Sequence, residues 1–184
     1  MADSNITKRA LAVALKELME EKPFAKISVA DICEKCDMNR KSFYYHFRDK
    51  YDLVNWIFDT EFISVIRRQG TSANWDLLEA LADYFYENRS FYRKALSVEG
   101  QNSFSEHFHE LLFNALQARM YELLGPGNAS DFQVNFLCDA SAMTLRRWIM
   151  DKDCMPPEEL LSQLRTCLQY IADRYASEGP EGAL

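Results

Sequence analysis

Apolar residues recur every three to four positions along most of this chain, which is the spacing of one buried face of an α-helix. The pattern runs through Thr7–Met19, returns in two short stretches before residue 50, and fills longer stretches up to about Ala176. No segment shows the strict alternation of a half-buried strand, and no internal repeat is visible. The chain is therefore predicted to be all-α.

Two short helices joined by a tight turn are predicted between residues 28 and 47. Ser28 can cap a helix that begins at Val29, and Asp31 is placed to complete the cap. The apolar stripe of this helix is formed by Val29, Ile32, Cys33 and Cys36. A turn at Asp37–Asn39 follows, and a second helix is expected from about Arg40 to Phe47.

The second short helix has two different sides. Phe43 and Phe47 are four residues apart and form an apolar edge that can pack on the preceding helix. The other side carries Arg40, Lys41, Tyr44, Tyr45 and His46. Because cations and aromatic rings with polar tips suit the major groove of DNA, the pair is predicted to be a helix-turn-helix DNA-reading unit.

This part of the sequence resembles the TetR family of bacterial transcriptional regulators. The resemblance is carried by the first helix, Thr7–Met19, by Ser28-Val29 and Asp31-Ile32, and above all by Ser42-Phe43-Tyr44-Tyr45-His46-Phe47 with Lys50 and Leu53. It covers roughly the first third of the chain. The sequence departs from the family at Asp37, where a glycine is usual, and at Cys33 and Cys36, where alanines are usual.

The resemblance implies a division of roles on DNA. Base reading is expected from the start of the second short helix, at Arg40, Lys41 and Ser42. Contacts to the phosphate backbone are expected from Ser28, Tyr44, Tyr45, His46 and Lys50. The alternative is that these side chains form an ordinary solvated surface.

Charge is distributed unevenly along the sequence. The chain has 21 Lys and Arg against 28 Asp and Glu, and its net charge of -7 by itself disfavours nucleic acid. Residues 1–50, however, hold ten cations and eight anions, a net of +2, so residues 51–184 carry -9. This asymmetry would orient the amino-terminal end toward DNA.

The length of 184 residues and the hydrophobic content of 48% fit one small and one larger helical unit. We predict a helix-turn-helix domain over residues 1–50, an effector-binding and dimerisation domain over 51–176, and a flexible tail over 177–184. No apolar run approaches the ~20 residues of a membrane span, and the start lacks a secretory signal. With five cysteines that fit a reducing compartment, the protein is expected to be cytoplasmic.

The larger unit is predicted to contain six helices. They are a long connecting helix from Tyr51 to near Gly70, then Trp75–Asn88, a short helix from a Ser90 cap to Ala95, a helix from Ser103 or Ser105 to Leu124 that stops at Gly125-Pro126-Gly127, and finally Asp131–Lys152 and Pro157–Ala176.

The last two helices are apolar over much of their circumference and need a cover. A two-fold dimer would supply it, and its candidate interface residues are Phe132, Phe136, Met143, Leu164, Leu168 and Ile171. The alternative is a fully intramolecular bundle. The resemblance favours the homodimer, because family members dimerise through their last two helices, and such a dimer would read a near-palindromic operator on double-stranded DNA.

Aromatic residues of the middle helices are candidates for an effector pocket. They include Trp75, Tyr84, Phe85, Phe104 and Phe108. An aromatic-rich core would have the same composition, so the expectation of a cavity depends on the resemblance. If a cavity is present, its aromatic content favours an apolar or planar small molecule.

Catalytic and metal chemistry find little support in the sequence. Cys33 and Cys36 share an apolar face without a second ligand pair, and His107 and His109 point to different sides of a helix. No nucleophile motif or phosphate-binding glycine loop is present. We therefore predict no metal, no cofactor and no enzyme activity, and an α-helical enzyme or cofactor carrier remains a distant alternative.

The sequence thus predicts a ligand-responsive DNA-binding regulator, acting as a repressor. An alternative keeps the fold but replaces the small molecule with a protein partner. It is based on similarity to the subgroup that includes an activator of dihydroxyacetone-kinase operons, which binds a kinase-like protein. That similarity is carried by Tyr44-Tyr45-His46-Phe47, Trp56-Ile57-Phe58, Phe62, Phe91-Tyr92 and Pro156-Pro157-Glu158-Glu159-Leu160-Leu161.

Overall fold

A computed structural model of the chain describes all residues except 1, 70–74, 99–102, 125–129 and 179–184. Over these residues the regular structure is entirely helical, which confirms the all-α prediction. The elements are α1 (Ala2–Glu21), the short 3₁₀ turn η1 (Phe24–Lys26), α2 (Val29–Lys35), α3 (Arg40–His46), α4 (Lys50–Phe58), the π-helical segment η2 (Asp59–Ile63), α5 (Ser64–Gln69), α6 (Trp75–Glu87), α7 (Arg89–Leu96), α8 (Phe104–Leu124), α9 (Asp131–Met150) and α10 (Pro157–Glu178).

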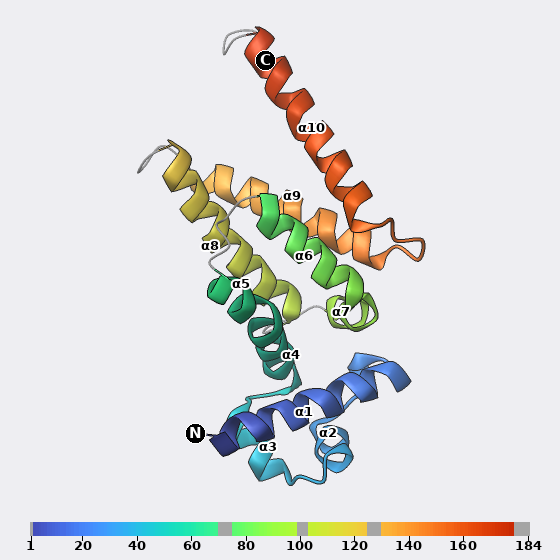
Figure 1. Ribbon diagram of the computed structural model, residues 1–184. Helices are drawn as coiled ribbons and strands as arrows, with labels where there is room; N and C mark the ends of the chain where they lie inside the picture. Colours follow the sequence, from blue (N-terminus) through green and yellow to red (C-terminus); the bar gives the residue numbers. More distant parts are fainter. Residues whose placement is uncertain (1, 70–74, 99–102, 125–129, 179–184) are drawn as a thin grey trace.

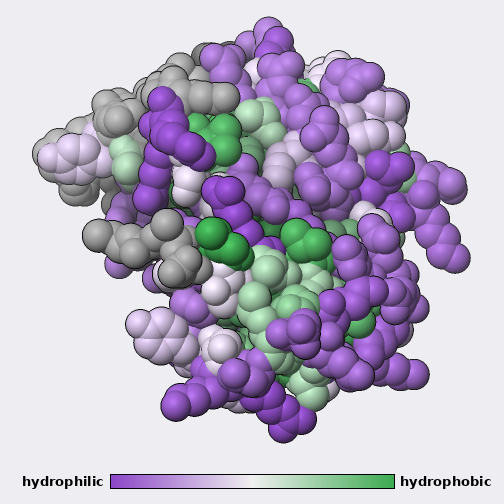
Figure 2. All heavy atoms as spheres, turned by 60° about the horizontal axis from the view of Figure 1, so that its bottom comes forward, coloured by the Kyte–Doolittle hydropathy of each residue, from purple (hydrophilic) through white to green (hydrophobic). Residues whose placement is uncertain are grey.

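The helices form a small head and a larger body. The head consists of α1, α2 and α3, and α4 leads from it into the body, where α8 and α9 pack along each other (Figure 1). Only the start of α10 packs on the body, against α6, and the rest of the helix extends away from it, at the opposite end of the molecule from the head. Seen from the head end, the surface carries mainly hydrophilic side chains, with apolar ones between them (Figure 2).

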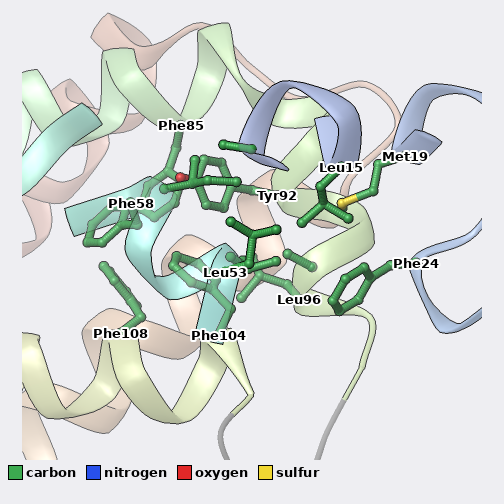
Figure 3. Packing of buried hydrophobic residues seen from close by; sticks show 14 of the residues in the cluster. Leu15, Met19, Phe24, Leu53, Phe58, Phe85, Tyr92, Leu96, Phe104 and Phe108 are labelled. Atoms are coloured by element: carbon green, nitrogen blue, oxygen red, sulfur yellow. The ribbon is translucent and has the colours of Figure 1, made fainter. Parts of the chain in front are cut away.

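One hydrophobic core runs from the head into the body. Leu15 and Met19 of α1 lie at its head end, Leu53 of α4 lies in the middle, and the buried ring of Phe58 stands among the aromatic rings of the body (Figure 3). The side chain of Lys94 in α7 adds a polar tie, because its ammonium donates to backbone carbonyls at the end of α1. The predicted domain boundary after residue 50 therefore falls at the start of α4, which packs with both the head and the body. The division into two domains stays a prediction.

The predicted long connecting helix is wrong in one respect. Between α4 and α5 the chain widens into the π turn η2, where the hydroxyl of Ser64 donates to the carbonyl of Asp59 at 2.7 Å. Apolar residues continue through this turn, so their spacing does not reveal it. The predicted end near Gly70 adjoins residues outside the described ones.

Most other helix ends agree with the sequence to within a few residues. α1 and α7 are exceptions, since α1 begins at Ala2 instead of Thr7 and α7 begins at Arg89 with Asn88 as its cap instead of Ser90. α9 ends two residues early and α10 continues to Glu178, into the predicted tail. The predicted stop at 125–127 and the tail beyond 178 lie outside the described residues. None of the described helices is both long and apolar enough to cross a membrane.

Candidate nucleic-acid interface

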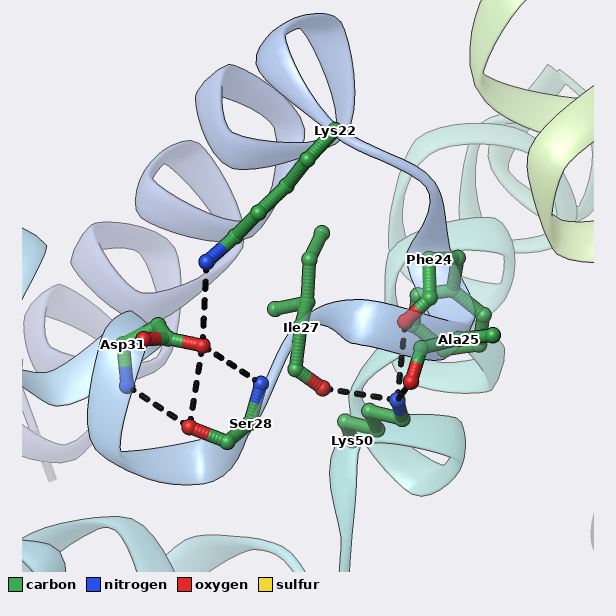
Figure 4. Close-up of polar contacts among 7 residues, drawn as sticks. All are labelled: Lys22, Phe24, Ala25, Ile27, Ser28, Asp31 and Lys50. Carbon is green, nitrogen blue, oxygen red and sulfur yellow. Dashed lines mark hydrogen bonds and ion pairs between the residues drawn. The ribbon is translucent and has the colours of Figure 1, made fainter.

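A reciprocal cap fixes the start of α2. The amide of Asp31 donates to the Ser28 hydroxyl at 3.2 Å, while the Ser28 amide and hydroxyl donate to the Asp31 carboxylate at 2.8 and 2.9 Å (Figure 4). Lys22 of α1 lies 3.1 Å from the same carboxylate. These contacts, with the Ser28 amide first, lower the pKa of Asp31 from 3.8 to about 2. The carboxylate thus joins α2 to α1, and the Ser28 hydroxyl is already used in the cap.

The turn between α2 and α3 has left-handed backbone at Asp37, with φ of 52°. Among the described residues other than glycine, no other has a positive φ. The turn is closed by the Met38 amide, which donates to the carbonyl of Cys33 at 2.8 Å. Aspartate tolerates this geometry better than most residues because its short side chain is polar and unbranched at Cβ. The turn predicted from the sequence is confirmed.

The side chain of Asn39 caps α3, and two buried rings anchor it. The side-chain oxygen Oδ1 of Asn39 accepts hydrogen bonds from the Ser42 amide at 2.8 Å and from the Ser42 hydroxyl at 3.2 Å. Phe43 and Phe47 are almost completely buried, as predicted. The helix is therefore held on one side only, and the Ser42 proton is directed at the cap.

The opposite side of α3 faces solvent. Arg40 and Lys41 are exposed at its first turn, and in the described part of the chain neither makes an ion pair. Tyr44 and Tyr45 are 59% and 82% exposed, and His46 is half-buried with its ring against Tyr45. Four exposed side chains with hydrogen-bond donors, together with the half-buried His46, thus surround the solvent side of a short helix that is anchored by two buried rings.

The structure assigns Lys50 a different role from the predicted phosphate contact. Its ammonium donates to the carbonyls of Phe24, Ala25 and Ile27 at 2.8, 3.3 and 2.7 Å (Figure 4). An ammonium has three protons, so none is left for a phosphate. Burial lowers the pKa of Lys50, while nearby Asp31 acts in the opposite direction. Lys50 ties α4 to the turn η1 inside the head.

Comparison with known proteins connects this geometry to a family. A family model described as "Bacterial regulatory proteins, tetR family" matches residues 11–57, which include α2 and α3. A second model, described as "Transcriptional regulator C-terminal region", matches residues 73–170 and so more than half of the chain.

The chain belongs to the TetR family. It is a DNA-binding transcriptional regulator of the TetR type, and its relatives are regulators and not enzymes. One relative is the "HTH-type dhaKLM operon transcriptional activator DhaS" of Lactococcus lactis subsp. lactis (strain IL1403), which is 30% identical over 149 residues, covering 79% of this chain and 78% of that protein.

Solved structures agree with this assignment. The structure of "Dihydroxyacetone kinase operon activator DhaS" is 28% identical with a TM-score of 0.62, and the match covers 90% of this chain and 95% of that one. A TetR transcriptional regulator from Streptococcus agalactiae 2603V has the same coverage, 23% identity and a TM-score of 0.68. The second likeness shows the shared fold.

The predicted effector residues of this TetR regulator mostly lie in a packed core. Phe85 and Phe104 are buried against the ring of Phe58, and Tyr84 is hydrogen-bonded to its neighbours. Trp75 is half-buried, with a guanidinium over its ring. Of the five, only Phe108 lines a cavity of about 730 Å³ between α8 and α9. Sequence reasoning missed this cavity, because its apolar wall residues come from three different helices and are interspersed with serines and charged residues.

The predicted dimer residues fall into three groups. Phe132 and Phe136 are 77% and 62% exposed and stack on each other along α9, and Met143 is exposed on the same helix. Leu164 is half-buried against the protein's own core. The side chains of Leu168 and Ile171 lie outside the described ones. No described group of His, Cys, Asp or Glu residues could hold a metal ion.

Proposed function

We propose that this TetR regulator reads a near-palindromic operator as a homodimer, with α3 of each subunit in the major groove. The observation that carries the proposal is the exposed face of α3, because its large aromatic rings and cations are left in solvent while the opposite side is anchored by Phe43 and Phe47. Exposed tyrosine rings on an anchored helix contribute little to the stability of the fold, but they are available for contacts with a binding partner.

The residues on this face have different roles in the proposal. Arg40 and Lys41 donate to base edges, since they stand at the first turn and make no internal ion pair among the described residues. Ser42 assists as an acceptor, because its proton is directed at Asn39. Tyr44, Tyr45, His46 and, more weakly, Ser28 contact phosphates.

Dimerisation is supported by the apolar surface at the far end of the body. The stacked pair of Phe132 and Phe136 lies in solvent on α9, and α10 extends beyond the body with little intramolecular cover (Figure 1). A second copy can bury both features across a two-fold axis. Two heads would then lie about one turn of DNA or a little more apart, which is the geometry of a palindrome.

The body is proposed to control the heads by binding a small-molecule effector, with repression as the default. The cavity between α8 and α9 supports this choice. An activator controlled by a protein partner is the second candidate, favoured by the similarity to DhaS, which is a transcriptional activator. Either ligand must bind the two states of the dimer with different affinity.

Selection from a pool of random duplexes tests the DNA-reading proposal. The parent should enrich a palindrome, and its affinity should fall with salt at a logarithmic slope of about 0.9 per neutralised phosphate. Lys41→Ala should weaken binding by about 1–3 kcal/mol and relax the preference at one position of each half-site. Tyr45→Ala should weaken binding to all sequences alike.

Two control variants distinguish the loss of a DNA contact from the general loss of a positive charge or of an aromatic ring. Lys152→Ala removes an exposed lysine at the end of α9, and Tyr121→Ala removes an exposed tyrosine of α8, so neither should change DNA binding. Dimerisation is checked by sedimentation at micromolar concentration. A folded dimer that enriches no sequence, or α3 variants that bind like the parent, would contradict the proposal.

A further inference from the structure

A cavity of about 730 Å³ lies between α8 and α9, beside the end of α7. Its volume is within the range of about 300–1,000 Å³ that small-molecule sites occupy. Its lining is mainly apolar and open to solvent on one side, and it includes Leu96 of α7, Phe108 of α8 and the pair Ala142 and Met143 of α9. The cavity is thus next to the aromatic core but not inside it, since the rings of Phe85 and Phe104 pack directly against each other.

The lining of the cavity contains as many acidic as basic side chains. Glu106 and Asp139 supply negative charge, and Arg146 and His109 supply the basic groups. His109 Nε2 lies 2.8 Å from Asp139 Oδ1, so these two side chains are paired with each other. Because positive charge does not exceed negative charge and the other lining residues are apolar apart from two serines, the site favours a neutral occupant over an anion.

One polar group of the wall lacks a partner. The Ser105 hydroxyl is buried, and within the described residues nothing lies in hydrogen-bonding reach of it. Buried hydroxyls are normally hydrogen-bonded, because desolvation without a partner is unfavourable. Ser105 also stands in the first turn of α8, where it faces a space large enough for a ligand.

We propose that this cavity binds a small, neutral, mainly apolar molecule whose carbonyl or hydroxyl oxygen accepts a hydrogen bond from Ser105. Phe108, Leu96 and Ala142 surround the apolar part of the ligand. Met143 lines the cavity and is also exposed on α9 near the proposed dimer surface. The ligand therefore lies where its presence can alter the pairing of subunits, and this regulatory consequence rests on the proposed function.

Fluorescence titration with Prodan tests the site. Prodan is a neutral naphthalene ketone whose emission shifts to the blue in apolar surroundings, so it has both features of the proposed ligand. The parent should bind it saturably, with one site per subunit. Ala142→Trp should fill the cavity and weaken binding by at least about tenfold. Ser105→Ala should weaken it by about three- to tenfold through loss of one hydrogen bond.

Ala118→Trp is the matched control, because it places the same bulky ring on an exposed part of α8 away from the cavity. It should bind Prodan like the parent. Absence of saturable binding by the parent would overturn the proposal, and so would parent-like binding by both Ser105→Ala and Ala142→Trp. If Ala142→Trp fails to fold, Ser105→Ala decides alone.

Titration of the same proteins with the selected palindrome, without Prodan, separates this proposal from the proposed function. Parent and variants that bind DNA but show no Prodan site would count against the cavity only. A parent that binds Prodan at Ser105 but no DNA would count against the proposed function and leave the ligand site supported.

Discussion

The head and the body hold their helices in place by different means. In the head, α2 and α3 have only seven residues each, and isolated helices shorter than about 12–15 residues are marginal in water. Side chains therefore fix their ends, through Ser28 with Asp31, Asn39 with Ser42, and Lys50 with three carbonyls. In the body, α6, α7 and α8 have 13, 8 and 21 residues, and they pack around stacked aromatic rings.

This difference suits the two tasks. A reading helix must keep its position to a fraction of an ångström when DNA binds, and directional hydrogen bonds at helix ends provide such precision. In the proposed function the body changes state with a ligand, which requires packed helices that can shift as units. Single substitutions can test the aromatic core of the body, the polar contacts of the head and the contacts between the two parts. They give four predictions, ordered from the largest expected effect to the smallest.

Phe58→Ala should have the largest effect. The Phe58 side chain is 1% exposed and contacts rings from α6, α7 and α8. Its removal leaves a cavity at the centre of the body and should lower the free energy of unfolding by about 3–5 kcal/mol. Urea unfolding followed by circular dichroism measures the loss.

Phe58→Leu is the control for this substitution, because it keeps much of the volume and should cost less than about 1.5 kcal/mol. Equal losses in the two variants would show that aromatic packing itself, and not filled space, holds the body together. A loss below about 1 kcal/mol for Phe58→Ala would contradict the importance assigned to this core.

Lys50→Met tests the polar mechanism in the head. Methionine keeps an unbranched side chain but removes the ammonium, which lies over the ring of Phe24 and joins the carbonyls around η1 to α4. Part-buried carbonyls without a donor should lower the free energy of unfolding by about 2 kcal/mol. The same urea experiment measures it.

The decisive observation for Lys50 is its behaviour on DNA. If it only braces the head, Lys50→Met should leave the salt dependence of DNA binding at the parental slope, whereas loss of a phosphate contact would reduce the slope by about 0.9. A reduced slope in a fully folded variant would restore the phosphate contact predicted from the sequence.

The joint between head and body contains a chain of hydrogen bonds. Lys16 of α1 lies 2.6 Å from Glu61 of η2, which accepts the Tyr84 hydroxyl at 3.1 Å. Because Tyr84 gives its proton to Glu61, Tyr92 must donate to Tyr84 across 2.8 Å. Burial raises the pKa of both phenols, so they stay protonated donors. The chain connects the buried core of the body to the first helix of the head.

Glu61→Gln should therefore affect coupling more than stability. The Lys16–Glu61 pair is about one-third exposed, so its loss should cost less than about 1 kcal/mol in unfolding experiments. DNA affinity should change by more than this stability loss accounts for, because the head is less firmly oriented on the body. An unchanged affinity for the operator would show that Lys94 and the shared core hold the joint without Glu61.

The contrast between head and body also explains which features the sequence could predict. The cap of α2, the turn at Asp37 and the buried edge of α3 were predictable, since their partners stand three to five residues apart. The carbonyl partners of Lys50 lie 23 to 26 residues away, so no local spacing in the sequence indicates them, and the sequence alone predicts a phosphate contact instead.

In the body, contacts between residues far apart in the sequence matter even more, so less could be predicted. Aromatic residues such as Phe85 and Phe104 are typical both of ligand pockets and of filled cores. Only the packing of four helices shows that these two belong to a filled core. The cavity that is present depends on how α8 crosses α9, and its polar wall residues carry no local pattern. Exposure of Phe132 and Phe136 agrees with the surface expected of α9, while the dimer itself stays a prediction.

The smallest expected effect concerns pH and Asp31. Its pKa is lowered from 3.8 to about 2 in the folded head, so the folded state takes up this proton less readily than the unfolded chain. The contribution of Asp31 to stability is therefore fully present above pH 3.8 and is lost as the pH falls toward 2. Asp31→Asn removes the titrating group, so the difference between parent and variant in the urea midpoint should shrink between pH 4.5 and about 2. A constant difference across this range would mean that the Ser28 cap holds α2 without help from the carboxylate charge, and the head would then depend on hydrogen-bond geometry alone.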